Sequence, residues 1–288
     1  MTRAPVLLMA VLLSACATVP EDRNAAPLLD PTLVEMTARL PGDYTTVLTR
    51  SERLDGQHPL LMNIEPQPGS GPDRLEFLMT QLDHGGSPRM FVLAIEATAD
   101  QQSPEGYFAP LDSAGQVHRQ CELQFSLQRE GFSASTNPDT CRFGEGNQST
   151  GLLKEIAFDG NHLVIGDRLV NLSTGEPLAD DQIHAFSPVR AFSGWAGRRE
   201  GDGWHRSTPF ELHSGDDQID LVDAAGMSLG MSVNLHLHDP GRDQDPILRM
   251  TVSDSDSGEV IAQGWADPDA ESLGIALPDI QIGLQRLE

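Results

Sequence analysis

Hydrophobic and polar positions alternate along most of the chain with a period of two residues. In Cys121–Leu127, a cysteine, two leucines and a phenylalanine share one side, while glutamate, glutamine and serine take the other. Such alternation predicts a β-strand with one buried and one wet face. Residues 75–82 and 91–96 are further strand candidates.

Hairpins are predicted as well as single strands. Residues 155–158 and 163–165 flank Asp159-Gly160-Asn161, a turn composition typical of hairpins. A succession of antiparallel hairpins predicts a barrel or a strongly curved sheet.

One short helix is expected before the strands. Asp30 suits the N-cap position and Pro31 the first turn, and apolar residues at positions 33, 34, 36 and 40 form a stripe before Pro41-Gly42 stops the helix. The sequence therefore predicts a mostly β protein in which a short helix precedes an antiparallel barrel.

A smaller C-terminal β unit is predicted over residues 193–288. The stretch 193–206 is rich in glycine and arginine, and alternation resumes at residues 231–237 and 248–252. These strands could form a small β-sandwich or could extend the first sheet. The barrel unit is assigned to residues 30–192.

Two histidines in the C-terminal unit are candidate metal ligands. His236 and His238 stand on the polar side of an alternating strand, and Asp239 follows. Neutral imidazoles in this arrangement could share a zinc ion if a third ligand were present. No third ligand is evident, and a solvated strand face explains the pair more simply, so no metal site is predicted.

The N-terminus carries a targeting pattern. Arg3 precedes an apolar stretch at residues 6–13 that is too short to span a bilayer, and Leu-Ser-Ala-Cys ends it at Cys16. This resembles a bacterial lipoprotein signal, which implies lipidation of Cys16, a tether over residues 17–29 and membrane attachment through the lipid. Ala17 after the cysteine implies, by analogy, the periplasmic face of the outer membrane in the cell envelope. An ordinary cleaved signal peptide is the alternative.

The charge of the chain excludes several classes of partner. The 288 residues include 43 acidic and 19 basic side chains, a formal net charge of −24. Nucleic-acid binding requires a basic face and is therefore not expected. Signatures of common hydrolases and of phosphate-binding loops are also missing from the sequence.

Cys121 and Cys141 are the remaining cysteines. In an exported protein an even pair is most simply a disulfide. A catalytic thiol is the alternative, but Cys121 lies on the apolar side of its strand, where thiolate formation is disfavoured.

The middle of the chain also contains a series of recognisable elements. They are Leu40-x-Gly42-x-Tyr44, His58-Pro59-Leu60-Leu61, Gln120-Cys121-Glu122, Gly131-Phe132-Ser133-Ala134-Ser135-Thr136, Asp139-Thr140-Cys141 and Glu155-Ile156. Over residues 35–197 this series resembles the CpcT/CpeT family of chromophore lyases, most specifically between the two cysteines. Where that family has a Pro-Tyr-Arg-Gln-Arg-like run, this chain has Ser87-Pro88-Arg89-Met90-Phe91, and the Tyr-x-Glu-Gln-like element before it corresponds to Thr80-Gln81.

The resemblance implies a calyx-like, lipocalin-like barrel that holds an open-chain tetrapyrrole. It implies Arg89 as a contact for a bilin propionate, with Tyr44, Gln81 and Phe132 as further ligand-binding residues. No resident cofactor is expected, and the catalytic residues and any protein partner are not identified.

Three functions follow from these observations. The first is an envelope lipoprotein whose barrel binds an apolar or tetrapyrrole-like ligand. The second is an active lyase that promotes thioether attachment of a bilin to a cysteine of a client protein. The third is a non-catalytic structural or interaction lipoprotein.

Overall fold

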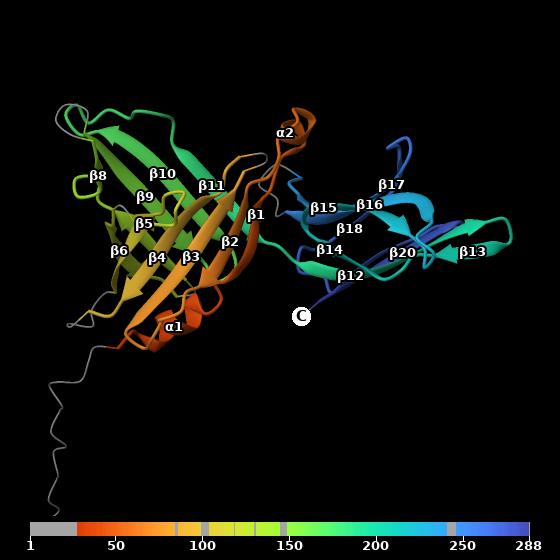
Figure 1. The fold of residues 1–288 in the computed structure, drawn as a ribbon, viewed down its shortest axis with the longest axis horizontal. Coiled ribbons are helices and arrows are strands. Elements are labelled where there is room, and N and C mark those ends of the chain that lie inside the picture. Colours follow the sequence, from red (N-terminus) through yellow and green to blue (C-terminus); the bar gives the residue numbers. More distant parts are fainter. Residues whose placement is uncertain are drawn as a thin grey trace, which may run out of the picture.

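The chain is mostly β, as the alternation predicts, in a computed structural model that describes residues 28–83, 86–98, 104–117, 119–129, 131–144, 149–240 and 246–287. Two short helices, α1 (Pro31–Thr37) and α2 (Arg50–Leu54), accompany the strands. Figure 1 shows a barrel at one end of the molecule and two smaller sheets at the other.

The first sheet closes on itself as a ten-stranded antiparallel barrel, with one additional strand at its rim. Its strands are β1 (Gly42–Thr46), β2 (Leu61–Pro66), β3 (Arg74–Leu82), β4 (Arg89–Glu96), β5 (Glu105–Pro110), β6 (Cys121–Leu127), β7 (Phe132–Thr136), β9 (Thr150–Phe158), β10 (Leu163–Asn171) and β11 (Gln182–Pro188), and the rim strand is β8 (Arg142–Phe143). Each barrel strand pairs with its neighbour in the order β10-β11-β1-β2-β3-β4-β5-β6-β7-β9. The pairing of β9 with β10, which runs from Phe158 opposite Leu163 to Thr150 opposite Asn171, closes the ring.

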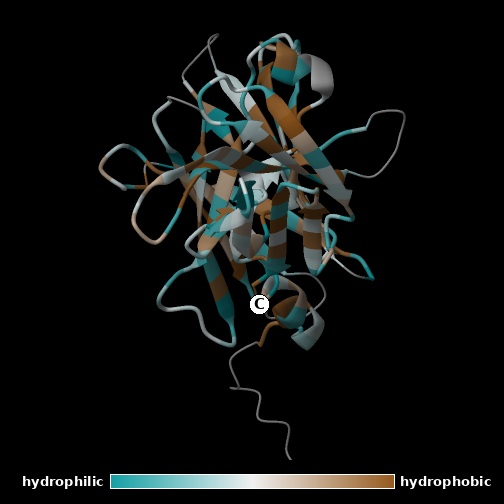
Figure 2. Ribbon diagram, turned by 90° about the vertical axis from the view of Figure 1, so that its right-hand side faces the viewer, coloured by the Kyte–Doolittle hydropathy of each residue, from teal (hydrophilic) through white to brown (hydrophobic). Residues whose placement is uncertain are grey.

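The local predictions of strands are confirmed. β6 has the bounds that the alternation gave, and Cys121, Leu123 and Phe125 are buried while the residues between them are exposed. Figure 2 shows the alternation as hydrophobic and hydrophilic bands along the strands. The predicted hairpin at Asp159-Gly160-Asn161 joins β9 to β10, and Gly160 has a positive φ of 96°, which suits glycine at a tight turn.

α1 covers one end of the barrel. The Asp30 side chain accepts a hydrogen bond from the Thr32 amide at 2.7 Å, so Asp30 is the N-cap as predicted. Leu33 and Leu40 are fully buried in the barrel core. The helix lies near the start of β3, since the Leu29 amide donates to the Pro72 carbonyl at 2.9 Å.

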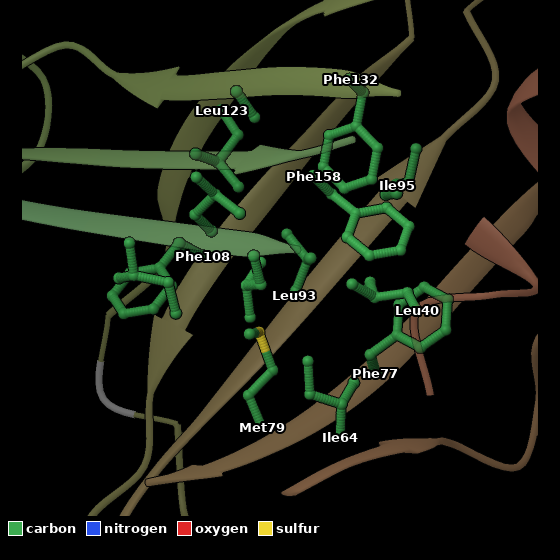
Figure 3. Close-up of a cluster of buried hydrophobic side chains, with 14 of the residues drawn as sticks. Leu40, Ile64, Phe77, Met79, Leu93, Ile95, Phe108, Leu123, Phe132 and Phe158 are labelled. Atoms are coloured by element: carbon green, nitrogen blue, oxygen red, sulfur yellow. The ribbon is translucent and has the colours of Figure 1, made fainter. Parts of the chain in front are cut away.

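Side chains fill the barrel from α1 to about its middle. Figure 3 shows leucine, isoleucine, methionine and phenylalanine side chains from facing strands pointing toward one another, among them Ile64, Phe77, Leu93, Phe132 and Phe158. This packing leaves no wide calyx at the α1 end, because protein interiors are packed to the density of organic crystals.

A disulfide joins β6 to the segment after β7. The Cys121 and Cys141 sulfur atoms are bonded, and their Cα atoms lie 4.9 Å apart. Both residues are buried within the barrel core. Neither sulfur is therefore a thiol nucleophile.

The C-terminal part forms two further sheets. One contains β12 (Ala191–Glu200), β13 (Gly203–Arg206), β14 (Phe210–His213), β19 (Ser272–Ala276) and β20 (Ile280–Arg286), and the other contains β15 (Gly215–Val222), β16 (Ser228–His238), β17 (Ile247–Asp254) and β18 (Val260–Ala266). Phe192, Ile282 and Leu284 from the first sheet share one hydrophobic cluster with Val233 and Met250 from the second. The two sheets therefore pack face to face as a β-sandwich, which is one of the two arrangements that the sequence left open.

The polar side of β16 is not the solvated face that the sequence suggested. His236 is only 6% exposed. The barrel end covers this side: the Arg53 Nη2 atom on α2 donates to the Leu237 carbonyl at 3.2 Å, and His58 and His236 line the same cavity of about 690 Å³. A segment distant in sequence thus buries residues whose local pattern indicates exposure.

We expect the disulfide to contribute substantially to stability. Replacing both Cys121 and Cys141 with alanine should lower the free energy of unfolding by about 3 kcal/mol, because the bridge restricts a loop of about 20 residues in the unfolded chain. Urea denaturation followed by circular dichroism measures this change. In a Cys16→Ser background, thiol titration of denatured, unreduced protein should find no free thiol, and two reactive thiols would contradict the bridge.

Candidate functional site

A cavity of about 470 Å³ opens at the end of the barrel opposite α1. β3 runs from Arg74 near α1 to Leu82 at the far end, and the cavity is bounded by residues near the end of β3 and the start of β4. Its apolar walls are formed by Pro88, Met90, Phe91, Phe108, Pro110, Leu111, Leu152, Leu169 and Ala179. The polar groups Gln81, Arg89, Lys154, Asp167, Asp180 and Gln182 complete its lining.

Strand register brings the predicted pair Gln81 and Arg89 together at this rim. Gln81 is directly opposite Arg89 in the β3–β4 ladder. Gln81 also continues the inward series of Phe77 and Met79 on β3, because residues two apart share a face of a strand. The two side chains therefore belong to one site, although the segment between the strands separates them in sequence.

The deepest polar residue of the cavity is Lys154, which is the only lysine in the chain. It lies on β9 between the inward-facing residues Leu152 and Ile156, and it is 3% exposed. The Lys154 amide donates a hydrogen bond to Thr136 Oγ1 at 2.8 Å, and Thr136 Oγ1 donates to the Leu152 carbonyl at 2.7 Å. These bonds fix the backbone from which the lysine side chain extends.

The ammonium group of Lys154 lies between one carboxylate and two aromatic rings. Its Nζ atom is 2.9 Å from Oδ1 and 3.0 Å from Oδ2 of Asp167, which is opposite Lys154 in the β9–β10 ladder. It is also 5.1 Å from the ring centre of Phe91 and 4.8 Å from that of Phe108. Ring faces attract cations, so these contacts partly replace water around the ammonium group.

Burial lowers the pKa of Lys154 below its ordinary value of 10.5. The Asp167 carboxylate opposes this shift by favouring the charged form, and the positive charge of Arg89 adds to it. Burial also lowers the pKa of the nearby His184, and the charges of Lys154 and Arg89 act in the same direction. The site thus places two cations, Lys154 and Arg89, and two carboxylates, Asp167 and Asp180, in a partly apolar space.

Arg89 supplies a second cation nearer to solvent. Its side chain is exposed, and within the part of the chain that the structure describes no ion pair or hydrogen bond engages it. An arginine with free donors can bind a carboxylate or phosphate in a bidentate manner. Lys154 at depth and Arg89 at the rim thus place two cationic groups along one cavity.

This arrangement can accommodate a small molecule with both apolar and polar parts. Apolar walls favour rings or alkyl groups, whereas a buried ammonium and an arginine favour a carboxylate.

Among the described residues, no group of three or more histidine, cysteine, aspartate or glutamate side chains is placed to hold a metal ion. His236 and His238 have ring centres 6.3 Å apart, and His238 packs against Trp265.

The other predicted site residues lie elsewhere. Tyr44 and Phe132 are buried in the barrel core and do not line the cavity. The Tyr44 hydroxyl donates to the Leu40 carbonyl at 2.9 Å, and burial raises the pKa of Tyr44 to about 12.

Cys16 lies outside the described residues. Within the described ranges, no helix has the length and apolar character needed to cross a bilayer.

Comparisons with known proteins give little further information. No protein-family model matches the sequence, and no curated protein matches it. A selenomethionine structure of the CRL protein of Arabidopsis is similar at 12% identity and a TM-score of 0.41, covering 55% of this chain and 98% of that one. At that TM-score the likeness is too weak to carry information about fold or function.

The pKa of Lys154 can be measured directly, because a chain with one lysine gives one lysine signal. After incorporation of ¹³C-labelled lysine, the side-chain signal should titrate below pH 10.5. The substitution Asp167→Asn should lower the pKa further, since it removes the charge that favours the ammonium form. A wild-type value at or above 10.5 would contradict the described environment.

A second prediction concerns stability. Because the folded-state pKa of Lys154 is depressed, the unfolded chain holds this proton more tightly, so the charged group costs stability at pH 7. That cost disappears as the pH rises from the folded pKa toward 10.5. Asp167 is 37% exposed, so its carboxylate can remain partly hydrated when its partner is removed, although its Oδ1 atom is buried.

Lys154→Met should therefore leave the free energy of unfolding at pH 7 within about 1 kcal/mol of the wild-type value, or raise it. Any gain should shrink in alkaline solution. Chemical denaturation at pH 7 and at pH 10 tests both statements. A loss above about 3 kcal/mol at pH 7 would mean that the ion pair is chiefly a structural element.

Proposed function

We propose that this protein is a lipid-anchored envelope protein whose barrel binds an amphipathic small molecule that carries a carboxylate, of the tetrapyrrole type. The observation that carries the proposal is the single lysine buried against Phe91 and Phe108 in an open cavity. A buried ammonium is costly, and buried ionisable groups with a specific charge partner in a cleft cluster at functional sites.

The size and composition of the cavity support this ligand class. A volume of about 470 Å³ lies within the usual range for small-molecule sites. The apolar walls suit the ring system of an open-chain tetrapyrrole, and Lys154 and Arg89 suit its propionates. The resemblance of residues 35–197 to the CpcT/CpeT family leads to the same ligand class.

The envelope location is part of the proposal and rests on the N-terminal sequence. Leu-Ser-Ala-Cys at residues 13–16 is the pattern of a lipobox, and lipidation of Cys16 would anchor the protein at the periplasmic face of the outer membrane. There the barrel would carry or protect its ligand next to the membrane.

Bilin lyase activity is a more specific alternative to ligand binding alone. In such a reaction the client protein's cysteine supplies the sulfur nucleophile, so the lyase itself needs to hold and orient the bilin. Ligand binding is thus the step that the two functions share, and it is tested first. A purely structural role would leave the cavity without a ligand.

Biliverdin and its dimethyl ester form a suitable pair of probes, because they differ in the presence of free carboxylates. Biliverdin should bind the protein lacking residues 1–16 with a shift in its absorbance spectrum, and the ester should bind at least tenfold more weakly. No spectral shift at micromolar biliverdin would refute the tetrapyrrole proposal.

Variants connect the binding to the cavity. Lys154→Met should weaken biliverdin binding at least tenfold, which corresponds to about 1.4 kcal/mol, and Arg89→Leu should weaken it severalfold. Arg39→Leu is the matched control, because Arg39 is exposed on the α1 side of the barrel. Equal affinities of the wild type and the Lys154 and Arg89 variants would show that the two cations are not the carboxylate partners.

A further inference from the structure

A second candidate binding surface lies on the β-sandwich, away from the barrel cavity. The chain has three tryptophans. Two of them, Trp195 on β12 and Trp204 on β13, are 55% and 41% exposed on the outer side of the same sheet. Apolar side chains that gather in one exposed patch of a folded surface can mark a binding site. We define the platform as the outer face of β12, β13, β19 and β20.

Both indoles lie over glycines of neighbouring strands. A Cβ atom placed on Gly283 of β20 would come within 2.5 Å of Trp195 Nε1, and one placed on Gly197 would come within 3.3 Å of Trp204 Cε3. Gly283 is directly opposite Trp195 in the sheet. Because glycine has no side chain, each ring can lie directly on the sheet. The other side of each ring is open to solvent.

The floor beside the indoles is polar but uncharged. Register places five residues of β20 and β19 next to Gly283 on the outer face: Gln281, Gln285, Ser272, Gly274 and Ala276. All five are exposed. In a chain with 62 charged residues and a net charge of −24, this two-strand surface carries none of them.

Charged residues of the outer face lie beside Trp204 and on β14. Arg206 is opposite Gly197, Arg199 is opposite Trp204, and Glu211 of β14 is opposite Ser193. The uncharged floor thus adjoins Trp195 directly, whereas Arg199 and Arg206 flank Trp204.

We infer that this platform binds a neutral glycan, specifically a β-linked chain of pyranose sugars. The apolar C–H faces of equatorially substituted pyranose rings stack on flat aromatic rings, and hydroxyl groups exchange hydrogen bonds with amides such as those of Gln281 and Gln285. A tryptophan face offers this apolar contact at low cost in side-chain entropy.

The composition of the platform argues against other occupants. An anionic membrane surface attracts clusters of lysine and arginine, whereas the floor carries neither and the platform has only Arg199 and Arg206 beside Trp204. The fully buried centre of a protein interface is mostly apolar, whereas the floor beside the indoles carries glutamine, serine, glycine and alanine. A neutral polymer of hydroxylated rings requires neither charge nor aliphatic contact.

Strand geometry also fits an extended ligand. The two indoles cover positions separated by one strand and two residues, which corresponds to about 5 Å across the sheet and about 7 Å along it. A flat polymer can contact both rings with different sugar units, whereas a single small molecule of one ring cannot.

Retention of the full-length protein on chitin and cellulose beads tests the inference, with chitohexaose and cellohexaose titrations followed by tryptophan fluorescence. At least one polysaccharide should retain the wild type. Trp195→Ala and Trp204→Ala should each lower affinity at least tenfold, and Trp195→Phe should restore part of it because it keeps a flat ring. The double variant Gln281→Ala with Gln285→Ala should lose severalfold.

Trp265→Ala is the matched control. Trp265 is 47% exposed but lies on β18 in the other sheet, where Arg249 lies 4.8 Å from its ring centre. This variant should bind as the wild type does, and circular dichroism confirms that each variant is folded.

The inference would be overturned if neither polysaccharide retained the wild type, if the Trp195 and Trp204 variants were retained as well as the wild type, or if Trp265→Ala lost as much affinity as those variants. Binding to vesicles of phosphatidylethanolamine and phosphatidylglycerol that depends on Trp195 and Trp204, without glycan binding, would overturn it in favour of a membrane surface. Each outcome is independent of whether the barrel binds biliverdin.

Discussion

Pairing between β9 and β10 is the interaction on which the barrel depends. It joins the two ends of a sheet that would otherwise expose unpaired backbone groups at both edges, and it encloses an interior that apolar side chains pack. Every inward residue must then pack, pair or face the open end. The same ladder places Lys154 opposite Asp167, so the contact that closes the barrel also positions the cation at the base of its cavity.

The sequence predicts the strands well because their signal is local. The alternation in Cys121–Leu127 indicates that one face is buried, and Asp159-Gly160-Asn161 indicates a turn. Neither signal depends on residues far away in the chain. Closure and the burial of His236 depend on contacts between segments far apart in the chain, which periodicity does not contain. The short α2 helix that covers His236 has too few residues to show a helical period.

The candidate site was predicted only in part. Gln81 and Arg89 were identified from a resemblance, and register places them opposite each other. Lys154 was missed, although its signal is present: it is the only lysine, and it occupies an inward position of a strand whose neighbours at 152, 156 and 158 are apolar. A charged residue on the apolar side of an alternating pattern departs from the rule that the buried face of a strand carries apolar residues. Such departures are expected at functional sites. Tyr44 and Phe132 show the opposite case, in which residues singled out by a resemblance pack in the core.

The distribution of aromatic residues gives the two parts of the molecule separate optical signals. Both tyrosines, Tyr44 and Tyr107, belong to the barrel, and all three tryptophans belong to the sandwich. Tryptophan emission therefore reports the sandwich alone. Energy transfer from tyrosine to tryptophan, in contrast, depends on the two parts remaining close together, so a single spectrum distinguishes their separation from the unfolding of either one.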